Sequence, residues 1–162
     1  MTLQEFQSLI AANPSGVVLL EGKRKIPQED AIRATALAVN LTSAYPQLRF
    51  RSGNAPGSDE AFSEGVTQVD PSRLEIVAPY EGHRKAYRFE GASYSAPSNV
   101  MAAEEEALAE KTISATPRNK SLIEKRATGG RVAAKAAYLI RDTLKVVGNS
   151  DLLEIPICAI FY

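Results

Sequence analysis

The residues best suited to bind an anion lie in a glycine-rich run at positions 51–59, which reads RSGNAPGSD. The run follows a short apolar stretch and precedes a helical pattern, so it predicts a strand-to-helix turn. The first amides of a helix have no partner within it and attract phosphate or carboxylate. We therefore expect the exposed amides, Ser52 and Ser58 to bind phosphate or ribose, and Asp59 to cap the helix or hold a ribose hydroxyl. An ordinary turn explains the pattern equally well.

A second candidate anion site is the basic turn Gly22-Lys23-Arg24, which follows an expected buried strand at 17–20. The guanidinium of Arg24 offers a planar fork for phosphate, whereas Lys23 offers a point charge. Ligands of doubly wound sheets bind outside the carboxyl ends of the strands. Both turns follow strands, so we expect them at the same sheet edge. A solvated basic turn is the alternative for this segment alone. The P-loop spacing Gly-x-x-x-x-Gly-Lys-Ser/Thr is absent, which argues against triphosphate hydrolysis of that type.

Residues 80–99 interrupt the regular pattern with basic and aromatic side chains. Such side chains suit stacking on bases and contacts with phosphates. We therefore predict Arg84, Tyr87 and Arg88 as second-tier contacts from a lid over the ligand. The alternative is a loop whose tyrosines pack on the domain. His83 is the only histidine of the chain, so the sequence predicts no metal site.

The elements that must position these segments alternate between helix and strand. Apolar runs and helical spacing predict strands at 17–20, 48–51, 74–78 and 155–162, and helices at 28–44, 58–69, 100–115 and 130–147. Thr2 and Glu5 predict the capped start of a first helix, and Ser58 or Asp59 is the expected cap of the third. Arg141 is expected either at the sheet edge or in an ion pair. This alternation predicts an α/β, Rossmann-like fold with a mostly parallel sheet and helices on both faces.

The composition fits one soluble domain. The chain has 162 residues, of which 44% are hydrophobic and 23% charged. Its 19 basic and 19 acidic residues give zero net charge, which argues against a protein that neutralises long stretches of nucleic acid. The single cysteine, Cys158, is expected to be a buried and inert thiol in a reducing compartment. We see no signal peptide and no apolar stretch of the roughly 18 residues that a membrane span needs. We therefore expect a cytoplasmic protein without a membrane partner.

Three segments together resemble the SLOG superfamily: the turn Gly22-Lys23-Arg24, the run at 51–59 and the following AFSEG at 61–65. Its members share a Gly-x-Arg-like loop and a Ser-Gly-Gly-Ala-x-Gly-x-Asp turn before a helix ending in Glu-Gly-Ala. The superfamily includes DNA-processing protein A, the Lonely-Guy phosphoribohydrolases, molybdenum-cofactor carrier-like proteins and nucleotide sensors of phage defence. The resemblance covers residues 16–78, under half of the chain.

The resemblance implies ligand contacts from both turns. These contacts fall on Gly22, Arg24, Ser52, Gly53, Ala55, Gly57 and Asp59. Asn54 stands where the family has its second glycine, and asparagine tolerates a left-handed backbone. The Lonely-Guy signature Pro-Gly-Gly-x-Gly-Thr-x-x-Glu is absent, which puts that hydrolase activity in doubt. In SLOG-type relatives the last strand leads into a Gly-Gly-Thr loop. Here the chain ends at Tyr162, so we expect a truncated end or a site completed by something else.

We expect a single domain over residues 1–162, with an irregular insert at 80–99, that binds a nucleotide or nucleotide-derived phosphate ligand as a sensor, carrier or sequestering protein. No pair of nucleophile and general base is apparent, so binding is favoured over catalysis and no obligatory cofactor is expected. One alternative is a nucleotide N-glycosidase or phosphoribohydrolase, with Asp59 and Glu64 as the candidate acids. Another is a single-stranded DNA-binding protein resembling DNA-processing protein A. By analogy with SLOG relatives, a homo-oligomer is also expected.

Overall fold

The computed structural model describes residues 1–149 and 153–162. Within these residues a five-stranded sheet has the order β4-β3-β2-β1-β5, and every neighbouring pair is parallel. The strands are β1 (Val17–Glu21), β2 (Arg49–Gly53), β3 (Leu74–Val77), β4 (Ser93–Ser95) and β5 (Cys158–Phe161). The predicted α/β, Rossmann-like class is confirmed. The strand order reverses between β1 and β5, and sheets of this kind bind ligands beside such a point.

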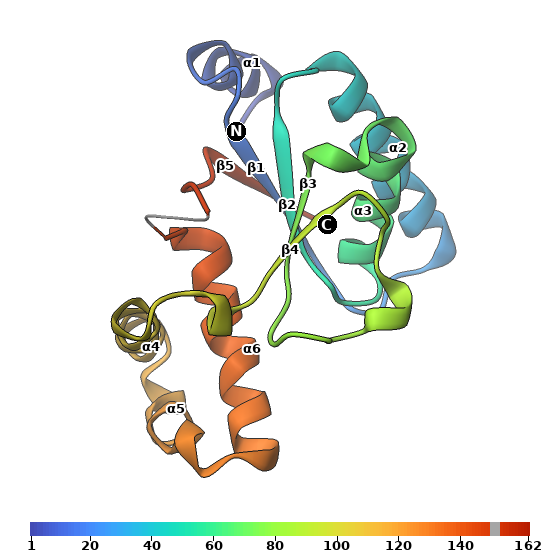
Figure 1. Ribbon diagram of the computed structural model, residues 1–162. Coiled ribbons are helices and arrows are strands. Elements are labelled where there is room, and N and C mark those ends of the chain that lie inside the picture. Colours follow the sequence, from blue (N-terminus) through green and yellow to red (C-terminus); the bar gives the residue numbers. More distant parts are fainter. Residues whose placement is uncertain (150–152) are drawn as a thin grey trace.

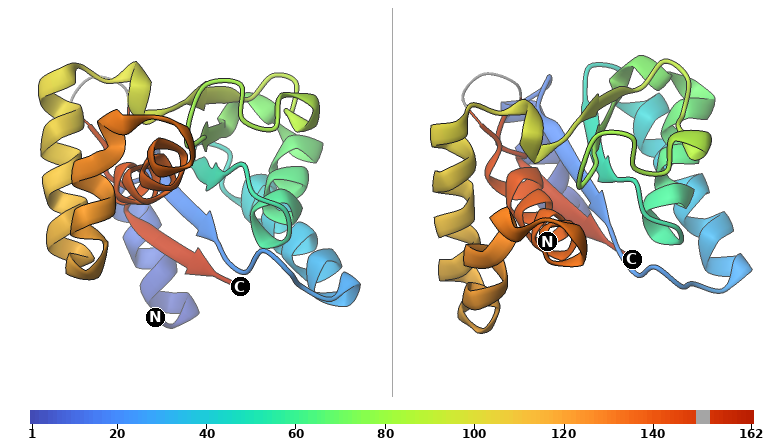
Figure 2. Two further views of the ribbon diagram at one scale, coloured as in Figure 1. Left: turned by 90° about the horizontal axis from the view of Figure 1, so that it is seen from below. Right: turned by 60° about the horizontal axis from the view of Figure 1, so that its bottom comes forward.

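Helices cover both faces of the sheet (Figures 1 and 2). In the described residues they are α1 (Leu3–Ala12), α2 (Gln28–Ala44), α3 (Ser58–Val69), α4 (Ala102–Ala115), α5 (Lys120–Glu124) and α6 (Gly130–Val147), with short 3-10 turns between some of them. The views show α2 and α3 on one face and α4, α5 and α6 on the other. None of the helices in the described residues is long and apolar enough to cross a membrane.

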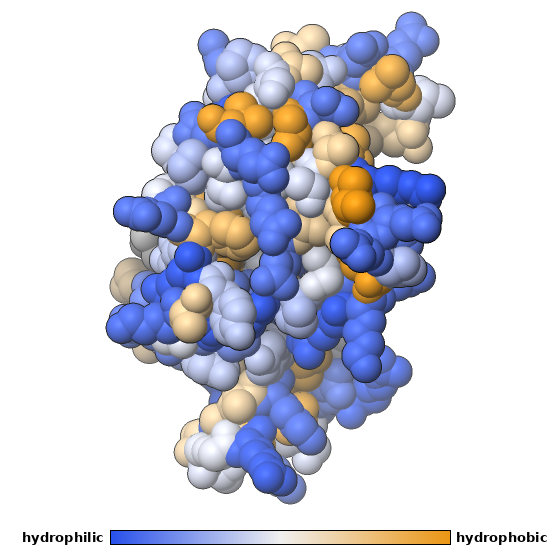
Figure 3. Space-filling view, turned by 90° about the vertical axis from the view of Figure 1, so that its right-hand side faces the viewer, coloured by the Kyte–Doolittle hydropathy of each residue, from blue (hydrophilic) through white to orange (hydrophobic). Residues whose placement is uncertain are grey.

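The core on the α2 and α3 face is almost wholly apolar. Side chains alternate along a strand, and here they send Val18, Leu20 and Phe50 toward these helices. A side chain at Gly65 would collide with the Thr35 carbonyl, so glycine lets α2 and α3 approach closely. The outer face over these helices is hydrophilic, with separate apolar patches (Figure 3).

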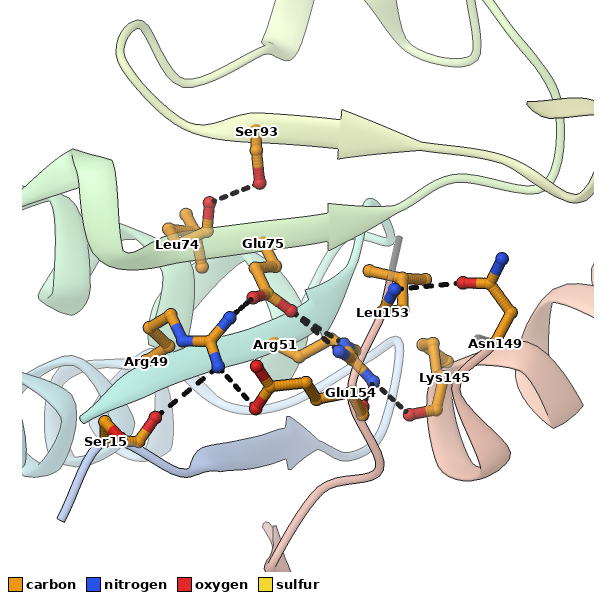
Figure 4. A network of polar contacts seen from close by, with 10 residues as sticks. All are labelled: Ser15, Arg49, Arg51, Leu74, Glu75, Ser93, Lys145, Asn149, Leu153 and Glu154. Carbon is orange, nitrogen blue, oxygen red and sulfur yellow. Dashed lines mark hydrogen bonds and ion pairs between the residues drawn. The ribbon is translucent and has the colours of Figure 1, made fainter. Parts of the chain in front are cut away.

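The α6 face of the sheet differs because charged side chains lie beneath the helix. The apolar part of this core is formed by Val77, Leu108, Ala109, Ile123, Ile140, Leu144 and Leu153. Beside it the buried guanidinium of Arg51 pairs with Glu75 on the neighbouring strand, with 2.8 Å between Nη2 and Oε2 (Figure 4). Buried charges remain in a protein interior only when they are paired or needed. The α2 and α3 face of the sheet is thus apolar, whereas the α6 face holds buried charged side chains and is the better candidate for a functional site.

Several expectations about single elements were wrong or incomplete. The cap of α3 is Gly57, at φ 87°, and Ser58 and Asp59 already lie inside the helix. Leu37 and Val69, which helical spacing places on inner faces, are exposed. The insert at 80–99 contains β4 and a short 3-10 turn, and α5 was not predicted.

Other local expectations were confirmed. The Thr2 side chain accepts from the Glu5 amide at 3.2 Å, and the Glu5 carboxylate accepts from the Thr2 amide at 2.6 Å. Helix α2 has the predicted bounds, 28–44, and α6 the predicted 130–147. The expectation of a buried Cys158 was wrong, because this residue is half-buried; its partial burial raises the pKa of the thiol.

Candidate functional site

The two predicted anion-binding turns lie side by side at the carboxyl ends of β1 and β2. The Ser58 amide, at the start of α3, donates to the Lys23 carbonyl at 3.0 Å. A side chain on Gly57 would collide with the main chain of Lys23 and Arg24. The positive φ of Gly57 also favours glycine there. Close approach of the two turns thus explains this glycine, and the role of the turns in ligand binding stays a prediction.

The polar side chains of the 51–59 run bond to main-chain carbonyls. Ser52 Oγ donates to the Leu20 carbonyl at 2.8 Å, which ties β2 to β1. Asn54 Nδ2 donates to the His83 carbonyl at 3.0 Å, and Ser58 Oγ approaches the Tyr162 carbonyl at 3.4 Å. These contacts hold the turns to their neighbours. Among the described residues, the buried side-chain nitrogens near this edge that lack a hydrogen-bond partner belong to His83 and Arg141.

The insert contacts the start of α3 through Arg84. Arg84 Nη2 lies 3.2 Å from Glu60 Oε1, and its guanidinium carbon lies 4.7 Å from the ring centre of Tyr87. Arg88 covers the ring of Tyr94, at 4.4 Å from its centre. The three predicted contacts Arg84, Tyr87 and Arg88 thus lie on one segment beside the 51–59 run. Their role as a lid stays a prediction.

Helix α6 adds Tyr138 and Lys145, which were not expected in the site, and Arg141, which was expected either at the sheet edge or in an ion pair. Tyr138, Arg141 and Lys145 are spaced by three and four positions, which puts them on one face of a helix. Lys145 Nζ pairs with Glu21 at the end of β1, and it lies 3.2 Å from Asp142 Oδ1. The sheet edge therefore faces a polar stripe of α6. A signal was present, because Arg141 and Lys145 each follow an apolar residue of the inner stripe.

Arg141 is a buried cation with donors to spare. It is 3% exposed, and its Nε lies 2.9 Å from Asp142 Oδ1 in an ion pair that lacks hydrogen-bond geometry. Neither Nε nor Nη1 has a hydrogen-bond partner among the described residues. The Arg141 guanidinium carbon lies 5.7 Å from the ring centre of Tyr138, and that of Arg24 lies 5.3 Å from the same centre. Two arginines from distant segments thus flank one aromatic ring.

His83 lies at the centre of the positive charge. Its ring is 7% exposed, Nε2 lies 2.9 Å from the Tyr138 hydroxyl, and Nδ1 has no partner among the described residues. Burial lowers the pKa of His83 from its usual 6.5. Four arginines lower it further, in the order Arg141, Arg84, Arg24, Arg88. A cluster of positive charge that disfavours a further cation favours an anion.

Asp59 faces the same place from the first turn of α3. The residue is 4% exposed, and burial and the nearby Glu21 raise its pKa to about 6, against the attraction of Lys145 and Arg141. No described residue donates a hydrogen bond to its carboxylate. A side chain at Gly53 would collide with Asp59 Oδ2 and Arg141 Nη1 together, so these two groups crowd the same side of that glycine. A carboxyl with a shifted pKa at a sheet edge is a typical feature of functional sites.

Glu64, the other candidate acid, lies elsewhere. It lines a groove of about 530 Å³ between α2 and α3, together with Ile32 and Thr35. Burial raises its pKa, and so does repulsion from Glu60. The structure therefore does not bring Asp59 and Glu64 together as an acid–base pair.

A small cavity of about 100 Å³ lies at the carboxyl ends of β3 and β4. It is lined by Ala78, Tyr80, Glu81, Arg88, Tyr94, Ser95, Ala96 and Asn99. Seven of these eight residues, all except Ala78, belong to the insert at 80–99. The described residues contain no group of three or more His, Cys, Asp or Glu side chains placed to hold a metal ion.

Comparison with models of known protein families gave no match, and neither did comparisons with curated proteins and with solved structures. The SLOG resemblance therefore stays a prediction from the motifs at 22–24 and 51–65.

Proposed function

We propose that this protein binds a nucleotide or a nucleotide-derived phosphate ligand at the carboxyl edge of its sheet, as a sensor, carrier or sequestering protein. The observation that carries the proposal is the buried guanidinium of Arg141, whose Nη1 has no partner among the described residues. It lies with Arg24 against the ring of Tyr138, beside His83. Arg84 and Arg88 of the insert add positive charge near His83. A bound anion offsets the repulsion among such cations.

Arg141 gives this cluster its ligand-binding character. A buried donor without a partner costs about 1–3 kcal/mol, and more when it is charged. A phosphate oxygen accepts a charge-assisted hydrogen bond from a guanidinium, so a phosphate beside Arg141 would supply the partner that Nη1 lacks. Arg24 is exposed and lies against the same Tyr138 ring, where it can contact the same anion.

Aromatic rings beside the arginines suit the base of a nucleotide. Tyr80 is exposed, and its ring centre lies 5.2 Å from that of His83 and 6.4 Å from that of Tyr138. Tyrosine faces stack on bases with about 1–3 kcal/mol per base. The site also lies beside the reversal of strand order at β1 and β5, where Rossmann-like sheets bind nucleotides.

A nucleotide N-glycosidase is the second candidate, because Asp59 has a pKa near the physiological range. A carboxyl with a pKa of about 6 can exchange protons efficiently near neutral pH. This function predicts release of free adenine from AMP, followed by chromatography, and loss of that release in Asp59→Asn. A wild-type protein that binds AMP without releasing adenine is a binding protein.

Thermal unfolding in the presence of AMP, cyclic AMP and ADP-ribose tests the main proposal. A ligand at a hundred times its Kd adds about 2.7 kcal/mol to the folded state, which corresponds to a rise in Tm of about 5–10 °C for a domain of this size. Arg24→Ala and Arg141→Met should abolish this rise. Arg33→Ala is the matched control, because Arg33 is an exposed arginine on α2 that pairs only with its helical neighbours Glu29 and Asp30.

Two results contradict the proposal. One is a wild-type Tm that none of the three compounds raises. The other is a rise that Arg24→Ala and Arg141→Met leave unchanged, since the ligand would then bind elsewhere.

A further inference from the structure

Asp59 and Arg141 both face the position where a side chain at Gly53 would stand, and they form no ion pair with each other. A side chain there would collide with Asp59 Oδ2 and with Arg141 Nη1 at once, so the two groups are close neighbours. Both residues are more than nine-tenths buried. Nε and Nη1 of the guanidinium have no hydrogen-bond partner among the described residues. A cation with free donors therefore lies beside a carboxyl to which no described residue donates.

The charges around Asp59 come from two neighbouring elements. Glu21 at the end of β1 repels its carboxylate, and so does Asp142 on α6, whereas Lys145 and Arg141 on α6 attract it. Lys145 pairs with both Glu21 and Asp142. Arg141 also faces Asp142 through Nε, at 2.9 Å, but its Nη1 has no partner among the described residues. Arg141 is thus the cation beside Asp59 with a donor left for a ligand.

An anion on Arg141 would bring a second negative charge next to the buried Asp59 carboxylate. Two like charges that lie close together in the protein interior do not both stay ionised, and the carboxyl takes up a proton. Resting on the proposed function, we infer that an anionic ligand binds at Arg141 together with one proton, which Asp59 takes up from solvent. The neutral carboxyl then donates its O–H to the ligand instead of repelling it.

Proton uptake makes binding dependent on pH in a defined direction. Without ligand the pKa of Asp59 is about 6, so at neutral pH most molecules must gain a proton when the anion binds. Affinity for the anion then rises as pH falls from 8 toward 6, by at most about tenfold per pH unit, and levels off below the ligand-free pKa. The fraction of protein with bound ligand then increases as the solution becomes more acidic.

Isothermal titration with cyclic AMP measures the proton directly. Its phosphodiester keeps one negative charge from pH 5 to 8, so any proton taken up on binding goes to a group of the protein. Titrations at pH 7.2 in Bis-Tris and in Tris, which differ in ionisation enthalpy, report the number of protons bound. We expect uptake of up to one proton per cyclic AMP in the wild type and none in Asp59→Asn, whose affinity should be independent of pH.

One variant serves as a control. Glu64→Gln removes another carboxyl of α3 with a raised pKa, but one that lies in the groove toward α2, and it should keep the proton uptake.

The outcomes separate the inference from the proposed function. Binding of cyclic AMP to the wild type without proton uptake overturns the inference and leaves the proposed function standing, as does an uptake that persists in Asp59→Asn. Absence of binding to the wild type from pH 5 to 8 overturns both. The wild-type titration decides the matter even where a variant fails to fold.

Discussion

Two buried arginines, Arg51 beneath α6 and Arg141 on α6 itself, differ in their hydrogen-bond partners. Arg51 on β2 is fully buried and makes four hydrogen bonds: two to Glu75, at 3.0 and 2.8 Å, and two from Nη1 to the carbonyls of Lys145 and Glu154, at 3.1 and 2.8 Å. Arg141 on α6 is as deeply buried, yet two of its nitrogens have no hydrogen-bond partner. The first guanidinium is saturated by the fold, and the second has capacity for a ligand.

Arg51 belongs to a network of ion pairs with Glu75, Arg49 and Glu154, here called the clamp, which holds the site in place. Arg49 joins it by pairing with Glu75 at 3.0 Å and with Glu154 at 2.6 Å (Figure 4). The clamp ties β2 and β3 to the segment before β5 and to the C-terminal part of α6. Since Lys145 and Arg141 are one helical turn apart, the clamp fixes the helix that carries the site. The comparison teaches that burial of a charge alone does not indicate function, whereas burial without partners does.

The same substitution at both arginines gives the largest expected effect. Arg51→Met leaves Glu75 with Arg49 alone and removes the donor of the Lys145 and Glu154 carbonyls, and breaking a buried pair costs about 3–5 kcal/mol. Arg141→Met removes a cation whose donors are unsatisfied, so we expect a change of about 1 kcal/mol or less. Urea unfolding at pH 7 measures both. Equal losses of stability in the two variants would contradict the distinction between the arginines.

Asp59→Asn is expected to have a somewhat smaller effect, and one that changes with pH. The pKa of Asp59 rises from 3.8 to about 6 on folding, so folding binds a proton. Its contribution to stability is full below pH 3.8 and is lost as pH rises through 6, by about 3 kcal/mol in total. The variant should therefore match the wild type near pH 4 and exceed it by up to about 3 kcal/mol at pH 8.

Urea unfolding at pH 4, 6 and 8 checks this expectation. A difference between Asp59→Asn and the wild type that is the same at all three values would show that Asp59 does not titrate as the structure indicates. Such a gain in stability at the expense of a site is common where a buried group serves function.

Much of the fold follows from local patterns in the sequence. Helical spacing and the cap at Gly148 were enough to predict α6 with its observed bounds. The three-residue strand β4 was missed, because a strand so short carries no periodic signal. The cap of α3 was misplaced by one residue or more, since Ser58 and Asp59 are common caps and only the contact of Gly57 with the neighbouring turn decides the boundary.

The site was harder to predict, because its chemistry depends on long-range contacts. Arg24 and the 51–59 run were recognisable from residue types and from their places after strands. The burial of Asp59 and the missing partners of Arg141 depend on α6, which lies about eighty residues farther along the chain. Tyr138 joins Arg24 to His83 only in three dimensions. Spacing within a segment cannot show which distant charge it will meet.

Nitrogen-15 NMR of the arginine side chains, during a titration with cyclic AMP, tests the central claim most directly. The Nε–H signals of Arg141 and Arg51 can be assigned from the two methionine variants. We predict that the Arg141 signal shifts as the ligand binds, because its free donors meet the phosphate, while the Arg51 signal stays in place. Binding that leaves Arg141 unchanged, or that shifts Arg51 as much, would contradict the account.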